Sequence, residues 1–415
     1  MPDSSSYDEL TGVQTAIING EALIKDRFLK DGYFNAVKFV DDVLSCFPSG
    51  YFKTPMNDKG GETVYKYNKE KGIFEDTGIP WIEQKLEKIL GEDLRTGFYS
   101  RVVKHLQVKT YVDPRNFQPD PNVIVLKNGT YHIFEKALLP HQATFNARQT
   151  LPINYDPDAL CPINLKFLNE IIPGYIIFWQ EWLGYHIYKT YIWQRVVVLV
   201  GDGDNGKSTL LKVIIALLGK ENVSKQTLYR LSTNRFAAAE LKDKLANISA
   251  DIGPEEIKHT GTIKMLSGDD WIDVERKNRD PESMKNYAKL TFSCNQLPKT
   301  PDETLAFFKR FVPITFEKII PKEEQDDKLL EKLTTPEELS GLFNWAVEGL
   351  HRALKRGRLH EPESLEERRE LYLAMSDPVT GFIRDCVIED PEGFIEKSEL
   401  YRQFVSYCKN KGFIP

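Results

Sequence analysis

The segment from Gly201 to Ser208 reads GDGDNGKS and matches the pattern GxxxxGK[ST], whose residues can hold the phosphates of a nucleotide. A run of β-forming residues precedes it, and a helical pattern that stops at Gly219 follows it. Such a loop turns backbone N–H groups toward phosphate oxygens, and the start of the helix adds partial positive charge. This context favours a site for ATP and Mg²⁺ over a glycine-rich turn that binds nothing. The expected nucleotide contacts are Gly201, Asp202, Gly203, Asp204, Asn205, Gly206, Lys207, Ser208 and Thr209.

Two residues of this segment and one beyond it have predicted chemical roles around the phosphates. Lys207 is expected to reach the β- and γ-phosphates, and the Ser208 hydroxyl is expected to ligate magnesium. Asp251 ends a short apolar run, where a second strand would deliver a carboxylate beside the metal. Taken alone, Asp251 is interpreted equally well as a helix-capping aspartate on a loop.

Two further polar residues follow in the order that a nucleotide hydrolase needs. Asn295 ends the apolar run AKLTFSC, where its amide can orient the attacking water next to the γ-phosphate. Arg310 lies in a short helical segment and can neutralise transition-state charge, often in the site of a neighbouring subunit. Taken singly, Asn295 is also a turn residue, and Arg310 is also a surface cation beside Lys309. Their order after the loop predicts a compact ATPase core.

The elements that must position these residues alternate along the chain. Apolar strand-like runs alternate with helical stretches through the core, which predicts an α/β fold with a central, mostly parallel sheet around the P-loop. Hairpin patterns and single helices precede it, and charged helical sequence follows it. The predicted domains are a helical segment at 1–48, an α+β domain at 49–190, the ATPase core at 191–320, a helical segment at 321–375 and a partial winged-helix-like domain at 376–415.

Local patterns add detail before the core. Residues 7–48 mix helical periodicity with polar turns, and the apolar spacing of residues 19–47 predicts an amphipathic helix or a helix pair. A helix is expected to start near Pro80 and to stop at Gly91, and Asn128-Gly129 predicts a hairpin turn. The proline-rich segment 140–173 is interpreted as a connection and not as a domain of its own.

Composition limits the classes of protein that the chain can represent. The 415 residues contain 55 basic and 61 acidic side chains, and the net charge of −6 argues against a surface coated in basic residues. The five cysteines lie far apart, without a CxxC pair or a Cys/His cluster at zinc spacing. The N-terminus has no secretory signal pattern, and no run of about 18 apolar residues occurs. We expect a cytoplasmic protein of a reducing compartment, without a membrane segment.

As a set, these motifs resemble those of superfamily 3 helicases, in particular the C-terminal part of phage and plasmid primase-helicases and their poxvirus-type relatives. The resemblance depends on GDGDNGKST, LANISAD, KMLSGDDWIDVERK, AKLTFSCN and FFKRFVPITF, and on LPINYDPDALCP and EWLGYHIY before them. It implies a ring-forming AAA+-type ATPase, usually a hexamer, that moves single-stranded DNA through a central pore. On this resemblance the phosphate and magnesium residues are Lys207 and Ser208, the magnesium-side carboxylate is Asp251, the sensor is Asn295 and the finger acting in trans is Arg310.

One departure from the family pattern affects the general base. The family often has two adjacent acids at the second motif, but Ile252 follows Asp251 here. The general base is therefore open among Asp251, Glu255 and Glu256.

A charged segment between the second and third motifs is the predicted DNA contact. DVERKNRDPESMKN lies between two strand-like runs, which predicts a hairpin with Lys277 near its tip. Arg276, Lys277 and Arg279 can grip the phosphates of DNA from such a hairpin. The resemblance agrees, because this family has its pore lysine on a hairpin at this place. Without the resemblance, a solvated charged turn is the better interpretation, since acidic residues dilute the basic ones.

The two ends of the chain give expectations about the parent protein. The residues up to Pro415 resemble the start of a winged-helix domain, and the chain stops where a recognition helix would follow. In the family, a primase domain commonly lies upstream on the parent polypeptide. Residues 1–50 supply none, so we expect no primase activity from this chain.

The predicted function is an ATP-dependent DNA helicase of plasmid, phage or virus replication that acts on single-stranded DNA and on fork or origin duplex. An ATP-switched initiator or loader, which would bind and melt DNA without processive unwinding, fits the same motifs. A small-molecule kinase would need an acceptor pocket and an arginine-rich lid, which the sequence does not contain.

Overall fold

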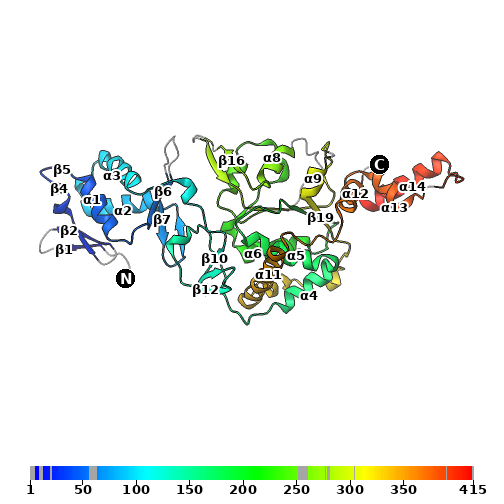
Figure 1. Cartoon of the computed structure of the whole chain (residues 1–415), viewed down its shortest axis with the longest axis horizontal. Coiled ribbons are helices and arrows are strands. Elements are labelled where there is room, and N and C mark those ends of the chain that lie inside the picture. Colours follow the sequence, from blue (N-terminus) through cyan, green and yellow to red (C-terminus); the bar gives the residue numbers. More distant parts are fainter. Residues whose placement is uncertain are drawn as a thin grey trace. The chain divides into compact units, whose positions relative to one another are not determined.

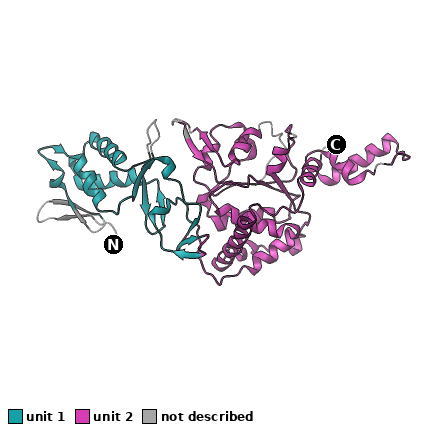
Figure 2. Ribbon diagram, in the orientation of Figure 1, with its two compact units in different colours: residues 1–125, 129–132, 137–150 teal, residues 126–128, 133–136, 151–415 magenta. Residues whose placement is uncertain are grey.

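The chain folds into two compact units (Figure 1, Figure 2). Unit 1 comprises residues 1–125, 129–132 and 137–150, and unit 2 comprises residues 126–128, 133–136 and 151–415. The computed structural model describes residues 5–8, 13–18, 21–55, 63–250, 260–275, 277, 281–302, 304–388 and 390–413.

Unit 1 begins with strands where the sequence predicts helix. Its first elements are β1 (Ser5–Asp8), β2 (Val13–Ile18), β3 (Glu21–Ile24), β4 (Leu29–Lys30), β5 (Tyr33–Phe34) and α1 (Ala36–Ser45). The prediction of a helix or helix pair over 19–47 is wrong at residues 21–24, 29–30 and 33–34, which are strands, and is confirmed at α1. Antiparallel pairing of β2 with both β1 and β3 satisfies the backbone there, and Ile18 and Leu23 enter the same core as Phe39 of α1.

Helices and short strands complete unit 1. They are β6 (Phe52–Pro55), β7 (Tyr65–Asn68), β8 (Ile73–Glu75), α2 (Gly78–Leu90), α3 (Thr96–Lys109), β9 (Tyr111–Val112), β10 (Val123–Leu126), β11 (Gly129–His132) and β12 (Ala137–Leu139). The predicted helix that stops at Gly91 is confirmed as α2, where Gly91 is the C-cap residue with φ +53°. The predicted hairpin at Asn128-Gly129 is confirmed, since β10 and β11 are neighbours in one sheet.

A five-stranded parallel sheet forms the centre of unit 2 (Figure 1). Its strands are β13 (Val196–Val200), β14 (Val223–Ser224), β15 (Ala246–Ser249), β18 (Lys289–Cys294) and β19 (Phe311–Thr315), in the spatial order β14-β15-β18-β13-β19. Every pairing between them is parallel. This confirms the predicted α/β fold with a parallel sheet. The carboxyl ends of the strands therefore meet at one edge, which we call the carboxyl edge, and their first residues meet at the amino edge.

Helices cover both faces of this sheet. One face, through Val198 of β13 and Phe292 of β18, packs into a core with α7 (Leu228–Thr233) and α8 (Thr260–Leu266). On the other side lie α5 (Ile176–Ile187), α6 (Lys207–Leu218) and α11 (Pro336–Arg356) (Figure 1). Because side chains alternate along a strand, every second residue of β18 faces α5, and Thr291 is one of these.

Hydrogen bonds among Trp182, His186 and Thr291 join α5 to β18 on the face of the sheet that α5 covers. The indole N–H of Trp182 donates to Thr291 Oγ1 over 3.1 Å, and Thr291 Oγ1 lies 3.1 Å from His186 Nε2. His186 Nδ1 lies 2.8 Å from the carbonyl oxygen of Trp182. If Nδ1 carries the proton, every polar group here has a partner. Burial lowers the pKa of His186 to about 3, and the neighbouring Lys289 acts in the same direction.

Two helices that precede the parallel sheet in the sequence belong to unit 2. Both α4 (Pro162–Ile171) and α5 belong to unit 2, because each is tied to α11. Glu338 of α11 accepts the backbone N–H groups of Ile163 and Asn164 at 3.0 Å. Glu181 of α5 is fully buried and pairs with two arginines of α11, one of them Arg352 at 2.9 Å. The proline-rich segment 140–173 thus contains a helix of the second unit.

The remaining elements of unit 2 are two strands and several helices. They are β16 (Trp271–Val274), β17 (Glu282–Lys285), α9 (Leu305–Arg310), α10 (Leu329–Leu333), α12 (Leu365–Ser376), α13 (Pro378–Cys386) and α14 (Lys397–Lys411). The helical character predicted after residue 321 is confirmed, while the winged-helix assignment stays a prediction. None of the helices in the described part of the chain is long and apolar enough to cross a membrane.

Candidate functional site

The loop between β13 and α6 lies at the carboxyl edge of the sheet. All five residues of β13 are buried between two parallel neighbours, so the strand fixes where the loop starts. Gly206 has φ +87°, and a Cβ added there would meet Ile171 Cγ2 at 3.0 Å. Asp204 adopts φ +57°, a conformation that aspartate tolerates better than most residues. The turn into α6 therefore requires a glycine next to the helix.

Inside this loop, the ammonium group of Lys207 is held by the loop's own oxygen atoms. Its Nζ donates to the carbonyl oxygens of Gly201 at 2.6 Å and Asp202 at 2.5 Å, and to Asn205 Oδ1 at 3.0 Å. Lys207 is buried, while Ser208 in the first turn of α6 is exposed. The loop thus gathers a cation, a helix start and an exposed hydroxyl within a few residues, which is the set that phosphate and magnesium binding uses.

Asn205 provides a direct test of whether the loop fits an anionic group. Its side chain is 2% exposed, and its amide Nδ2 has no hydrogen-bond partner among the residues that the structure describes. A buried donor without a partner costs free energy, so it calls for an acceptor. Gly203, by contrast, has open space around the position of a Cβ. The start of α6 has no side-chain cap either. These features fit a phosphate group.

Asn295 comes to the same edge as the loop. Strand β18 lies between β13 and β15, and Val200 is paired with Cys294 at the ends of their strands. The backbone N–H of Gly201 donates to the carbonyl oxygen of Cys294 over 3.3 Å. Asn295 follows directly and its side chain is exposed. The structure therefore places Asn295 next to the start of the loop, as its predicted role requires.

The predicted metal carboxylate and general base cannot be located in the same way. Strand β15 ends at Ser249 on the carboxyl edge, so the chain leaves the sheet near the loop. Asp251, Glu255 and Glu256 lie outside the described residues.

Two further segments contact the loop, namely α4 and the residues after β19. The sequence did not indicate that either belongs to the site. The rings and methyl groups of Phe167 and Ile171, on α4, approach Gly206 closely. After β19, Phe316 N–H donates to the Val200 carbonyl and Ile320 N–H donates to the Asp204 carbonyl, both over 2.8 Å. The sequence signals a helix at α4 through its proline start, but it contains no signal for this tertiary contact.

Arg310 lies at the amino edge, away from the loop of its own chain. It directly precedes β19, whose first residue, Phe311, is paired with Val196 at the start of β13. Its guanidinium donates to Gln194 Oε1 at 3.1 Å and to the Ala306 carbonyl at 3.0 Å. Burial and the neighbouring Arg195 lower the pKa of Arg310. Within one chain, Arg310 and Lys207 therefore do not share a site.

The predicted hairpin between the second and third motifs is confirmed. Strands β16 and β17 pair antiparallel, from Trp271 opposite Lys285 to Val274 opposite Glu282. Lys277 lies in the connection and is exposed, and Trp271 at the base of the hairpin is 47% exposed. The other two predicted DNA contacts, Arg276 and Arg279, lie outside the described residues.

An aspartate connects this hairpin region to the segment that follows Asn295. Asp302 Oδ2 accepts hydrogen bonds from Thr260 Oγ1 at 2.5 Å and Lys264 Nζ at 2.6 Å, both on α8. Burial alone would raise the pKa of Asp302, but the hydrogen bonds from Lys264, Thr260 and Thr304 hold it well below its usual range. Since α8 leads directly into β16, Asp302 links the Asn295 segment to the hairpin.

Two family models match parts of the chain. One, described as "D5 N terminal like", matches residues 59–173, and the other, described as a family of unknown function (DUF5906), matches residues 199–310. The second match contains the loop, Asn295 and Arg310.

The chain is also similar to two viral proteins. It is 25% identical over 343 residues to "Putative helicase 184R" of Invertebrate iridescent virus 6, a stretch that covers 70% of this chain and 35% of that protein. It is 25% identical over 239 residues to "Putative helicase L207/L206" of Acanthamoeba polyphaga mimivirus, which covers 51% of this chain and 24% of that protein. The chain thus spans about a third of the length of the first relative and about a quarter of the second. These similarities support the predicted resemblance to viral primase-helicases, without its assignment to superfamily 3.

Among solved structures, the chain is similar to the C terminal region of NrS-1. One such structure has a TM-score of 0.49 at 12% identity, covering 90% of this chain and 86% of that chain. A second has a TM-score of 0.47 at 11% identity, covering 90% and 86%.

Proposed function

We propose that this chain is the ATPase and helicase part of a superfamily 3 type replication protein, with an AAA+-like core that hydrolyses ATP with Mg²⁺. The observation on which the proposal depends is the carboxyl edge of the sheet. There, Lys207, Asn205 and the exposed Asn295 lie around one loop at the start of a helix, and Asn205 Nδ2 has no partner in the described part of the chain. The similarity to the two viral relatives supports replication as the setting.

The residues in and around the loop have separate roles in the binding and hydrolysis of ATP. The ammonium of Lys207 now donates to backbone carbonyls, and we infer that it exchanges them for β- and γ-phosphate oxygens when ATP binds. The Nδ2 group of Asn205, which has no partner among the described residues, gains an acceptor. Asn295 orients the attacking water from the neighbouring strand. Ser208 and Asp251 would hold the magnesium ion, which neutralises charge on the phosphates.

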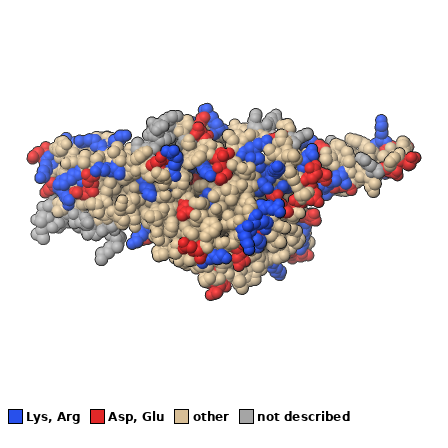
Figure 3. Space-filling view, viewed as in Figure 1, with Lys and Arg blue, Asp and Glu red and all other residues tan. Residues whose placement is uncertain are grey.

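Completion of the site requires a second subunit. Because Arg310 lies at the opposite edge of the sheet, it can stabilise the transition state only in the site of a neighbouring copy. This arrangement supports a ring, and we propose a hexamer. The hairpin with Lys277 would then grip single-stranded DNA in the pore, and Asp302 would connect it to the Asn295 segment. On the face that Figure 3 shows, acidic side chains are interspersed among the basic ones, so DNA binding has to be local.

The direct test compares ATP turnover with and without single-stranded oligothymidine. Turnover should rise severalfold with the DNA, and Lys207→Ala should abolish it, because transition-state charge loses its main cation. Lys212→Ala, on the exposed side of the same helix, is the matched control and should behave as the unaltered protein. Turnover that ignores DNA at both low and high salt would argue against a helicase.

A strand-displacement assay separates the helicase from the initiator or loader. We expect displacement of a strand from a long forked duplex, dependent on ATP. Ring assembly and ATP turnover without any displaced strand would favour the initiator or loader instead.

A further inference from the structure

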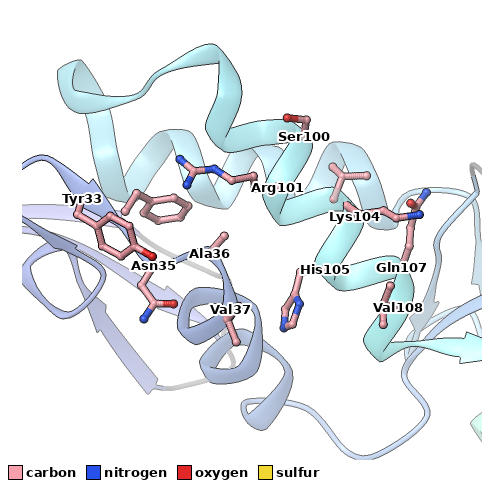
Figure 4. Close-up of a pocket in the computed structure, with 12 residues that line it drawn as sticks. Tyr33, Asn35, Ala36, Val37, Ser100, Arg101, Lys104, His105, Gln107 and Val108 are labelled. Carbon is pink, nitrogen blue, oxygen red and sulfur yellow. The ribbon is translucent and has the colours of Figure 1, made fainter.

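Unit 1 contains an open groove with a volume of about 840 Å³ (Figure 4). One side is formed by β5 and the first turn of α1, and the other side by α3. All of its lining residues belong to unit 1, whereas the loop and the hairpin belong to unit 2.

Phe34, which lines the groove, is held in place by aromatic packing. Phe34 of β5 stacks on Phe98 of α3, with ring centroids 4.7 Å apart and an angle of 25° between the rings. The ring centroids of Phe34 and of Phe39 on α1 lie 6.0 Å apart. Asn35 caps α1, since its Oδ1 accepts the backbone N–H of Lys38 at 3.0 Å. Packing and cap fix both sides, so the groove is preformed and little entropy is lost when it is filled.

The rim of the groove is basic. None of the residues that line it is acidic, whereas Arg101, Lys104 and His105 line it from α3. Asp41 of α1 lies beside one end, where it contacts His105 at 3.7 Å and Lys109 at 3.0 Å. No ion pair of Arg101 or Lys104 occurs among the described residues. Arg101 Nε donates to the Gly97 carbonyl oxygen over 3.3 Å, and its guanidinium lies 5.0 Å from the centroid of the Phe98 ring. Both side chains are exposed, so neither positive charge is balanced by a described carboxylate and both can meet an external anion.

Exposed apolar side chains accompany these charges. Tyr33 is 69% exposed at one end of the groove, and Val37 and Val108 are 51% and 58% exposed along it. In Figure 4, Arg101 extends from α3 toward the end where Tyr33 lies, and Lys104 extends toward the end where Gln107 lies. A flat exposed ring followed by cations spaced along a narrow groove is the combination that binds single strands, where bases stack and phosphates pair with cations.

We infer that the groove between α1 and α3 binds a segment of single-stranded nucleic acid. Tyr33 stacks on a base, Arg101 and Lys104 contact successive phosphates, and the two valines contact the sugars and bases between them. An acidic amphipathic helix is the other anionic partner to consider, but helix-binding grooves use deep pockets for large apolar anchors. Here the exposed apolar residues of the walls are small, and serine, asparagine and glutamine side chains interrupt them. The inference goes beyond the proposed function, because binding here needs neither ATP nor the hairpin.

The test measures the binding of fluorescein-labelled oligothymidine by the full chain, without nucleotide, across a salt series. The double variant Arg101→Ala/Lys104→Ala should bind about tenfold more weakly. Its slope of log affinity against log salt should shrink by about 1.4, since each phosphate contact on a single strand contributes roughly 0.7. Tyr33→Ala should also weaken binding about tenfold, whereas Tyr33→Phe should bind normally because it keeps the ring. Lys69→Ala/Lys88→Ala removes the same charge from exposed sites of unit 1 outside the groove and should leave affinity and slope unchanged.

Two results would overturn the inference. One is unchanged affinity and salt slope in the groove double variant. The other is a groove double variant that no longer binds a synthetic amphipathic helix peptide with a glutamate face but still binds oligothymidine. That result would identify a protein as the partner of the groove. ATP turnover without DNA should stay normal in all groove variants, so a failed helicase assignment and a failed groove assignment give different results.

Discussion

The two edges of the parallel sheet in unit 2 differ in what their side chains are free to do. At the carboxyl edge, Ser208 and Asn295 are exposed, and Asn205 has a buried donor without a partner in the described structure. At the amino edge, Arg310 is partly buried and bonded to Gln194, and Arg195 beside it pairs with Glu361. The carboxyl edge therefore presents an exposed hydroxyl and an exposed amide to a ligand. At the amino edge two hydrogen bonds hold the Arg310 guanidinium, although its Nε also has no partner among the described residues.

The separation of these edges has a simple physical origin. Strand β13 has five residues, which at about 3.3 Å per residue span roughly 16 Å. Because all five strands are parallel, the start of β19 cannot come near the end of β13. A site that needs both Lys207 and Arg310 must therefore use two copies of the chain.

The largest effect should come from one substitution at each edge, with the two variants tested first alone and then as a mixture. Lys207→Ala and Arg310→Ala should each lower ATP turnover at least ~100-fold, because each removes a cation from the transition state. A mixture of the two variants should recover part of the turnover, since an interface between them contains one intact Lys207 and one intact Arg310. Phosphate release measures it.

Lys309→Ala is the matched control for the amino edge, because Lys309 is an exposed cation next to Arg310. It should keep full turnover. If the two variants assemble together without any recovery, the assignment of Arg310 to the neighbouring site is wrong.

The next effect concerns Asn295, the neighbour of the loop at the carboxyl edge. Asn295→Ala should lower kcat by about 10- to 100-fold with little change in KM, because a misplaced water slows chemistry more than binding. Gln296→Ala, one residue further, should have a much smaller effect. Steady-state kinetics with ATP separate the two parameters, and a change in KM alone would remove Asn295 from the water-orienting role.

The contact between α5 and the sheet should make the stability of the protein depend on pH, because it contains the buried His186. Its pKa is about 3 in the folded protein against 6.5 in the unfolded chain, so the unfolded state binds the extra proton between these values. Stability should therefore fall as pH drops below 6.5, by about 2 kcal/mol from this residue at pH 5. His186→Gln should show a smaller loss between pH 7 and pH 5 in urea unfolding. An identical loss in both proteins would contradict the assignment.

The smallest effect should come from Asp302, which connects the carboxyl edge to the hairpin. Asp302→Asn weakens the contacts with Thr260 and Lys264, so the stimulation of turnover by single-stranded DNA should fall about threefold. Turnover without DNA should be nearly unchanged. If both rates fall together, Asp302 only stabilises the fold.

Local patterns predicted the parts of the fold that depend on near neighbours. Gly91 ends a helix, Asn128-Gly129 joins two strands, and the run before Gly201 is a buried strand, since each result depends on backbone preferences a few residues long. The same reasoning is wrong at residues 21–24, where apolar spacing suits both a helix and paired short strands. Pairing with β2 decides between them.

For the candidate site, the sequence by itself determined which chemical groups are present. The glycines, Lys207 and Ser208 follow one another along the chain, so their proximity needs no tertiary structure. Only the tertiary structure decided that Asn295 lies beside the loop and Arg310 at the far edge. The reason is that strand β18 inserts between β13 and β15 while β19 adds to the other side of β13, and contacts between distant segments leave no local pattern.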